Sequence, residues 1–245
     1  MPTQRIRVVS RDGQNVANVV TRLREAILNG DIPGGAVTTQ LALATEFETG
    51  RTPVREALRL LEREGLVVAD PNRRVRVTDL SAADAEELYV MRVALETVAI
   101  RLTIPTLSSD DIAELEACMA KMEHYMRAKD QIGMREPHRS FHVKLVAAAG
   151  PRGVAEIEQL FDHAERYRLA HGALTRRDWT LRSDEHRAIL DAVIAGDAAR
   201  AARELAEHYA HTARLVFSNL DAAFDGVRLR AALAAVAPGS ESALG

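Results

Sequence analysis

Four histidines have the residue type and the spacing to bind a transition metal. His138 and His142 are four residues apart, so both imidazoles leave the same face of one predicted helix. His186 and His208 fall on two further predicted helices. Neutral imidazole nitrogens that converge inside a helix bundle would form a metal site. A single histidine on a helix is more often a surface or hydrogen-bonded residue, which is the alternative for each of the four.

A second group of residues has the chemistry to contact DNA. Gly50 precedes a predicted helix, whose first turn offers free N–H groups and a positive dipole end to a phosphate. Arg51 and Arg55 lie one turn apart, so both guanidinium groups can reach guanine edges or phosphates. Thr52 can hydrogen-bond to a backbone phosphate. The alternative is an arginine-rich helix face that is only solvated.

The elements around Arg51 predict a winged helix-turn-helix. Apolar residues recur at helical spacing in three segments, which are residues 15–29, 39–47 and 51–64. Two short β-type runs flank a turn and predict a small hairpin, the wing, from residues 66–68 and 75–77. Three helices followed by a hairpin are the layout of a winged helix. Asn72 and Arg73 lie at the predicted tip of the wing, from which they could reach a neighbouring groove of DNA.

The histidines lie in a second, entirely helical part of the chain. Six helical segments are predicted, over residues 82–102, 109–128, 131–149, 153–171, 178–195 and 198–220. Ser81 is the expected N-cap of the first segment. No strand pattern interrupts them, so we expect an all-α antiparallel bundle and a mainly α protein.

These patterns predict five regions along the chain. They are an N-terminal arm (1–14), the winged helix (15–78), a linker (79–83), the helical domain (84–222) and a C-terminal tail (223–245). The end of the tail is rich in Ala, Pro, Gly and Ser and is predicted to be loose or only partly helical.

Composition narrows the class of protein. The 245 residues include one cysteine, Cys118, so no internal disulfide can form. No apolar run approaches the roughly 20 residues of a membrane helix, and we expect a cytoplasmic protein without membrane contact. Residues 1–78 hold 12 arginines against 9 acidic residues, although the whole chain carries a net charge of −3. A basic first domain on an acidic body fits a protein whose first domain alone meets phosphate.

The first domain resembles the GntR family of bacterial regulators. The resemblance rests on residues 24–30 (REAILNG), 51–58 (RTPVREAL) and 61–67 (LEREGLV). It implies that Arg51, Thr52 and Arg55 contact DNA and that Asn72 and Arg73 assist from the wing.

The first domain also departs from the family pattern at three positions. Gly50 stands where the family usually has serine, Glu48 where a turn glycine is usual, and Leu41 where some relatives carry a DNA-contacting arginine. The DNA sequence that is bound could therefore differ from that of relatives.

The second domain resembles the FCD effector domain of the FadR subfamily. The matching segments are residues 87–96 (ELYVMRVALE), 141–142 (FH), 147–150 (AAAG) and 185–192 (EHRAILDA). The resemblance implies a metal site built from one aspartate and three histidines. The aspartate position is His138 in this sequence. Four neutral ligands would favour zinc or nickel over magnesium or manganese.

The uncompensated charge of a divalent ion in this site would attract a carboxylate effector, and relatives commonly sense small organic acids. Arg92 is a candidate second anchor for that carboxylate, because its guanidinium binds carboxylates as a fork. Arg92 and Glu96 are four residues apart, so a plain helix salt bridge is the alternative.

The leading functional hypothesis is a metabolite-responsive transcription regulator, a repressor, that binds an imperfect DNA palindrome as a homodimer. One alternative is a metal-dependent hydrolase that uses the same histidines, with Glu185 as the nearby carboxylate. The other alternative is a DNA-binding protein whose helical domain serves only to dimerise.

Overall fold

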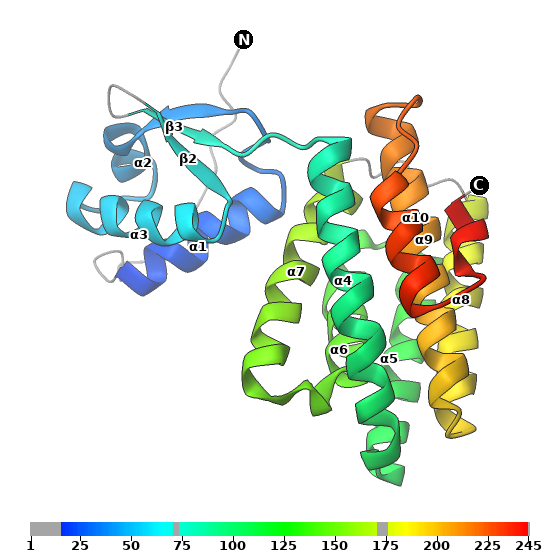
Figure 1. Ribbon diagram of the computed structural model, residues 1–245. Helices are drawn as coiled ribbons and strands as arrows, with labels where there is room; N and C mark the ends of the chain where they lie inside the picture. The colour runs from blue at the N-terminus through cyan, green and yellow to red at the C-terminus, as the bar shows by residue number, and fades with distance from the viewer. Residues whose placement is uncertain (1–15, 71–73, 171–175, 245) are drawn as a thin grey trace. The chain divides into compact units, whose positions relative to one another are not determined.

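The computed structural model describes residues 16–70, 74–170 and 176–244 (Figure 1). The chain divides into two compact units, and the boundary falls after Leu80. None of the described helices is long and apolar enough to cross a membrane.

The first unit is a winged helix. Its elements are α1 (Val16–Leu28), β1 (Val37–Thr39), α2 (Gln40–Glu46), α3 (Arg51–Arg63), β2 (Val67–Asp70) and β3 (Arg74–Val77). The three helices bury aliphatic side chains against one face of the sheet, and Leu23, Val54 and Leu61 are fully buried in this core. Thr39 caps α2 by accepting a hydrogen bond from the N–H of Ala42 at 3.1 Å.

The sheet of the first unit has three strands, whereas the sequence predicted only the two strands of the wing hairpin. The strand order is β1-β3-β2 and both pairings are antiparallel. Strand β1 was missed because it has only three residues, Val37 to Thr39, which are too few to show an alternating pattern. Val37 opposite Arg76 and Thr39 opposite Arg74 fix its register.

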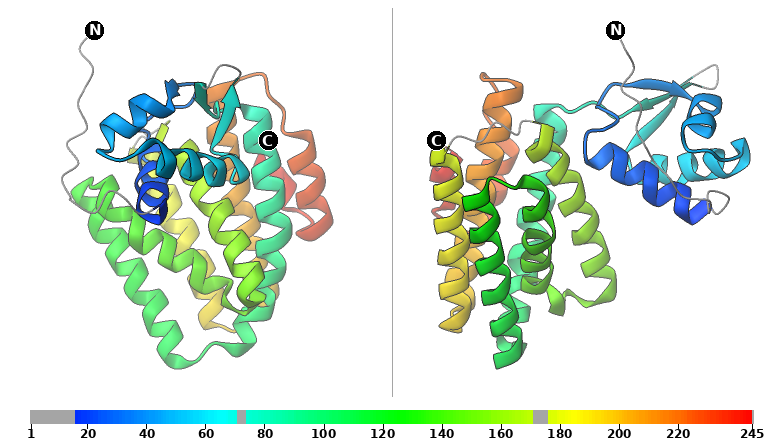
Figure 2. Two further views of the ribbon diagram at one scale, coloured as in Figure 1. Left: turned by 90° about the vertical axis from the view of Figure 1, so that its left-hand side faces the viewer. Right: turned by 180° about the vertical axis from the view of Figure 1, so that it is seen from behind.

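The second unit is a helix bundle. Its α-helices are α4 (Ala82–Thr103), α5 (Ser109–Ala128), α6 (Gln131–Leu145), α7 (Gly150–Ala170), α8 (Arg176–Ile194), α9 (Ala198–Leu220) and α10 (Val227–Val236). Most of these helices run side by side along a common direction (Figure 2). Helix α4 packs against α7, α9 and α10. The predicted N-cap is confirmed, since the Ser81 hydroxyl accepts a hydrogen bond from the N–H of Asp84 at 3.1 Å.

The described part of the predicted C-terminal tail, residues 223–244, is partly helical and packs against the bundle. Leu229 and Leu233 of α10 are fully buried, and a short 3₁₀ helix, η3 (Ser240–Leu244), packs against α9. The buried carboxylate of Glu86 accepts hydrogen bonds from the backbone N–H groups of Arg228 and Leu229 at 2.7 and 3.2 Å. This contact satisfies donors at the start of α10, whose N-cap residue, Gly226, has no side chain. The local sequence could not reveal a cap that lies about 140 residues away.

Candidate functional site

The structure brings His138, His142, His186 and His208 together. The first two lie on α6, the third on α8 and the fourth on α9. One donor nitrogen from each histidine lies within 4.8 Å of the others. The Nε2 atoms of His142 and His186 are 3.2 Å apart. Two nitrogens bound to one tetrahedral zinc ion are roughly 3.3 Å apart, so this pair already has the spacing of a metal site.

The four imidazoles are buried and suited to bind a cation. Their exposed fractions are 9% for His138, 2% for His142, 6% for His186 and 3% for His208. Burial, together with the neighbouring histidines, lowers the pKa of both His138 and His142 well below the usual 6.5. Both rings are therefore neutral at pH 7, which is the form that binds metals.

Glu185 is hydrogen-bonded to one of these four histidines, His208. One carboxylate oxygen lies 2.8 Å from Nδ1 of His208, and the other lies 2.7 Å from Nδ1 of His211. Burial by itself would raise the pKa of Glu185, but the hydrogen bonds from the two histidines lower this pKa to about 2. A carboxylate at Nδ1 fixes the tautomer of His208 and leaves its Nε2 as the ligand atom.

A network that includes Arg92 supports His142. The Tyr209 hydroxyl lies 3.2 Å from Nδ1 of His142 and donates a hydrogen bond to Glu96. Arg92 donates from Nε to Glu96 at 2.7 Å and from Nη2 to Tyr209 at 2.9 Å. Arg92 is only 5% exposed. It forms the salt bridge with Glu96 that the sequence offered as the alternative to binding an effector carboxylate. For Arg92 to bind an effector carboxylate, this pair would have to open.

The residues present fit a transition metal. Nδ1 of His138 is buried without a hydrogen-bond partner, and its nearest carboxylate oxygen, on Glu165, is 3.5 Å away. An unpartnered buried nitrogen beside three other imidazoles is costly unless a cation or water binds there. The four histidines could therefore form a metal site.

A cavity adjoins the histidines. It is lined by Met119, Met122, Met126, Met134, His138, Arg168, Ser183 and His186. Sequence reasoning missed this cavity. The spacing of Met119, Met122 and Met126 marks one apolar face of α5, but spacing alone cannot distinguish a face packed in the core from a cavity wall.

Helix α3 presents the predicted DNA-contacting residues. Gly50 is its N-cap and makes no side-chain cap, while Arg51 and Thr52 are exposed in the first turn. The side chain of Arg55 is 50% exposed and its Nε lies 3.1 Å from Glu56. Such an exposed pair is weak and can exchange for a phosphate. Asn72 and Arg73 lie outside the described residues.

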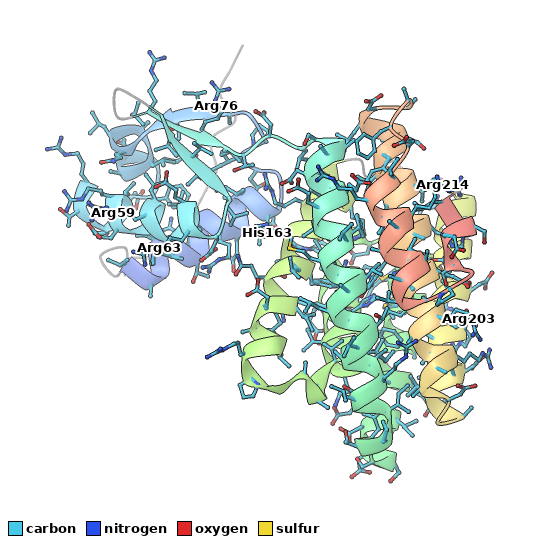
Figure 3. The ribbon with its side chains drawn as sticks, in the orientation of Figure 1. Arg59, Arg63, Arg76, His163, Arg203 and Arg214 are labelled. Carbon is cyan, nitrogen blue, oxygen red and sulfur yellow. The ribbon has the colours of Figure 1, made fainter. Side chains whose placement is uncertain are left out.

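Two further arginines extend this row of α3. Arg59 and Arg63 continue the four-residue spacing of Arg51 and Arg55, and both are exposed (Figure 3). Arg76 of β3 is also exposed. The spacing could have been read from the sequence, where only the first half of the row was singled out.

A winged helix with an arginine-lined third helix, followed by a helical domain with a buried histidine cluster, defines a class of two-domain, DNA-binding transcription regulators. The first unit matches the family described as "Bacterial regulatory proteins, gntR family" over residues 15–77. The second matches the FCD domain over residues 87–211. This chain belongs to the GntR family, in its FCD-containing subfamily.

Relatives of known name agree with this assignment. The chain is 31% identical over 198 residues to the uncharacterized HTH-type transcriptional regulator BphR of Paraburkholderia xenovorans, covering 76% of this chain and 79% of BphR. It is 27% identical to the HTH-type transcriptional repressor GlaR of Escherichia coli, covering 76% of this chain and 88% of GlaR. These relatives are regulators, so the chain is a transcription regulator and the hydrolase alternative is set aside.

Solved structures share the fold. E. coli McbR/YncC superposes with a TM-score of 0.74 at 22% identity, covering 86% of this chain and 99% of that one. Lar, which controls the Listeria monocytogenes agr system, superposes with a TM-score of 0.61 at 19% identity over the same shares.

Proposed function

We propose that this protein is a metal-containing repressor that binds operator DNA as a homodimer and responds to an organic acid. The observation that carries the proposal is the meeting of four buried histidines, His138, His142, His186 and His208, beside a cavity in the FCD domain. The repressor assignment is supported by relatives such as GlaR, which is named a repressor.

The donor set supports zinc or nickel as the metal. Four neutral nitrogens suit these ions, whereas magnesium and manganese prefer carboxylate, carbonyl and water oxygens. The ligands leave the charge of a divalent ion uncompensated, and a carboxylate effector would offset it. In this proposal the carboxylate faces the metal, while Arg92 holds Tyr209 behind His142.

DNA contacts are assigned to the first turns of α3. Arg51 and Arg55 reach base edges or phosphates, while Thr52 and the N–H groups that follow Gly50 bind a phosphate. Asn72 and Arg73 of the wing complete the contact in this proposal. Arg59 and Arg63 lie further along the same helix and would add contacts with the phosphate backbone.

An apolar stripe on α4 supports the homodimer. Met91, Leu95, Val98 and Leu102 are 45%, 43%, 51% and 55% exposed. Their spacing of four, three and four residues is that of helices packed against one another. Leu88, Val93 and Ile100 of the same helix are buried in the bundle, so the stripe is a second apolar face of α4. A second copy covers this stripe and provides the two-fold symmetry that a palindromic operator needs.

Measuring the metal content of the purified protein tests the proposed metal site. We expect about one zinc or nickel ion per chain in untagged protein, and loss of that ion in His186→Ala. His124→Ala is the matched control, because His124 is exposed and lies outside the cluster. The same preparations are then titrated with operator DNA, with and without organic acids. Wild-type protein that takes up no zinc or nickel would refute the metal site, and DNA affinity that no acid changes would refute effector sensing.

A further inference from the structure

One turn near the end of α7 consists of four buried residues that carry polar groups. Glu165, Arg166, Tyr167 and Arg168 are 6%, 6%, 1% and 8% exposed. Burying charged and hydroxyl groups is unfavourable unless they find partners. Contacts of this turn reach two places, which are the surroundings of the histidine cluster and the first turn of α4.

Glu165 and Arg168 lie beside the histidine cluster. They form a buried ion pair, in which Nε and Nη2 of Arg168 donate to the carboxylate of Glu165 at 2.7 and 2.6 Å. One oxygen of Glu165 is 3.5 Å from Nδ1 of His138, and Arg168 lines the same cavity as His138 and His186. A charge that appears in the cluster would therefore act on this pair at short range, where little water screens it.

The hydroxyl of Tyr167 lies at the start of α4. It donates a hydrogen bond to the carboxylate of Asp84 and accepts one from the backbone N–H of Ser81, whose nitrogen is 3.4 Å away. Burial and the hydrogen bond to Asp84 raise the pKa of Tyr167 well above its usual 10, so the hydroxyl keeps its proton at neutral pH. The hydroxyl of Ser81 in turn caps α4 through the N–H of Asp84. One phenol therefore holds both the N-cap and the first turn of α4.

Ser81 is also the first residue of the second unit, because the boundary between the units falls after Leu80. The chain therefore leaves the bundle for the DNA-binding unit at the residue to which Tyr167 is hydrogen-bonded. A displacement of Tyr167 would reach the connection between the two units without passing through the rest of the bundle.

We propose that this turn of α7, residues 165–168, couples occupancy of the histidine cluster to DNA binding, with Tyr167 as the positioning residue. A divalent ion held by the histidines would attract the carboxylate of Glu165 and repel the guanidinium of Arg168, so it changes the balance of their buried pair. The helix carries the resulting shift to Tyr167, because a hydrogen-bonded turn moves as a rigid element. The inference rests on the proposed function and adds the route by which the second unit acts on the first.

Thermodynamic linkage measures this coupling in the full chain. Zinc-loaded and metal-free protein are titrated with a DNA duplex that the wild-type protein selects from a random-sequence pool. The zinc affinity is then measured by competition with a chelator, with and without that duplex. We expect zinc to change the dissociation constant of the duplex at least about fivefold, and the duplex to change the zinc affinity by the same factor, because coupling between two binding sites is reciprocal.

Tyr167→Phe removes the hydroxyl and keeps the buried ring. We expect zinc to change the duplex affinity of this variant by less than about twofold, and the duplex to change its zinc affinity equally little. Zinc content and a single cooperative melting transition show that the variant is folded and loaded. Tyr125→Phe is the matched control, because Tyr125 is a half-buried tyrosine of α5 outside this turn and its variant should keep the coupling of wild type.

A second variant tests the same hydrogen bond from the side of α4. Asp84→Ala removes the acceptor of the Tyr167 hydroxyl, and we expect it to reduce both coupling factors at least about twofold. Asp110→Ala is the control, because Asp110 is an exposed aspartate in the first turn of α5 and its variant should couple as wild type does.

The outcomes separate this inference from the proposed function. Zinc that binds to wild-type protein but leaves its duplex affinity unchanged would overturn the coupling, although the proposed metal site would stand. Full coupling in Tyr167→Phe would overturn the role of Tyr167. Wild-type protein that takes up no zinc would refute the proposed metal site and this inference together.

Discussion

Polar residues that contact two of the four histidines determine which of their ring nitrogens remains available to a metal. Glu185 accepts hydrogen bonds from Nδ1 of His208 and of His211, and the Tyr209 hydroxyl lies beside Nδ1 of His142. These contacts leave the Nε2 atoms of His208 and His142 for a metal. The sequence suggested Glu185 only as a nearby carboxylate, and it gave no sign of His211 or Tyr209, because their partners come from another helix.

Replacing Glu185 with glutamine should weaken metal binding at the proposed site although all four candidate ligands remain. The amide lacks the charge that orients and polarises His208, and loss of such a partner typically costs 10- to 100-fold in metal affinity. Competition with a chelator measures the zinc affinity of Glu185→Gln. Asp184→Asn is the matched control, because the neighbouring Asp184 is exposed and should leave zinc affinity unchanged. Equal affinities for wild type and Glu185→Gln would contradict a positioning role.

The turn between α2 and α3 shows how a local departure from the family pattern is accommodated. Glu48 has φ of +50°, in the left-handed region that glycine favours. The resemblance already marked position 48 as a usual glycine, so this strain was foreseeable from the sequence. Gly50, two residues later, has φ of −81°, an ordinary extended conformation that serine also adopts. The turn therefore departs from the pattern at two positions, but only position 48 is strained.

Replacing Glu48 with glycine should stabilise the protein. Removing the left-handed strain should stabilise the folded state by about 1–2 kcal/mol. The greater freedom of glycine in the unfolded chain offsets about 0.5–1 kcal/mol of this gain. We expect a net gain of about 0.5–1 kcal/mol in the unfolding free energy of the first unit, measured by urea denaturation. Ala42→Gly, at an exposed helical position of α2, should lose about 1 kcal/mol. A loss of stability in Glu48→Gly would show that the turn is not strained.

At the scale of the whole molecule, the proposed dimer depends on helix α4. Its stripe of exposed apolar side chains would face water in an isolated domain, which is unfavourable. Large apolar side chains in a row on a helix surface mark an interaction site more often than chance exposure. Leu95 and Val98 lie in the middle of the stripe, and α10 packs beside the same helix. The stripe spans residues 91–102, while the four histidines lie on α6, α8 and α9. Dimerisation and metal binding can therefore be tested separately.

Replacing Val98 with glutamate should dissociate the proposed homodimer. Each copy would carry a charge into an apolar contact, and we expect the dimer dissociation constant to rise at least about tenfold. Sedimentation equilibrium measures this constant, while metal content should not change. Ile132→Glu on α6 is the control, because Ile132 is 84% exposed and lies outside the stripe. A Val98→Glu variant that sediments as wild type would exclude this face as the dimer contact.

The sequence by itself determined the features that depend on neighbours along the chain. Helical spacing predicted the three helices of the winged helix and the first six of the bundle, and the Ser81 cap was confirmed. The motifs around Arg51 and Glu87 identified the family. The spacing of His138 and His142 placed two candidate ligands on one face of a helix. These features are local, because side-chain periodicity and capping act within one or two helical turns.

Only the tertiary structure decided the features that join distant residues. Strand β1 depends on its pairing with β3, and the start of α10 depends on the carboxylate of Glu86, which is remote in sequence. The meeting of His186 and His208 with the α6 pair, the Arg92–Glu96–Tyr209 network and the methionine-lined cavity all depend on how helices pack. A helical pattern specifies which face of a helix is apolar, but the packing of side chains between helices determines which residue meets which.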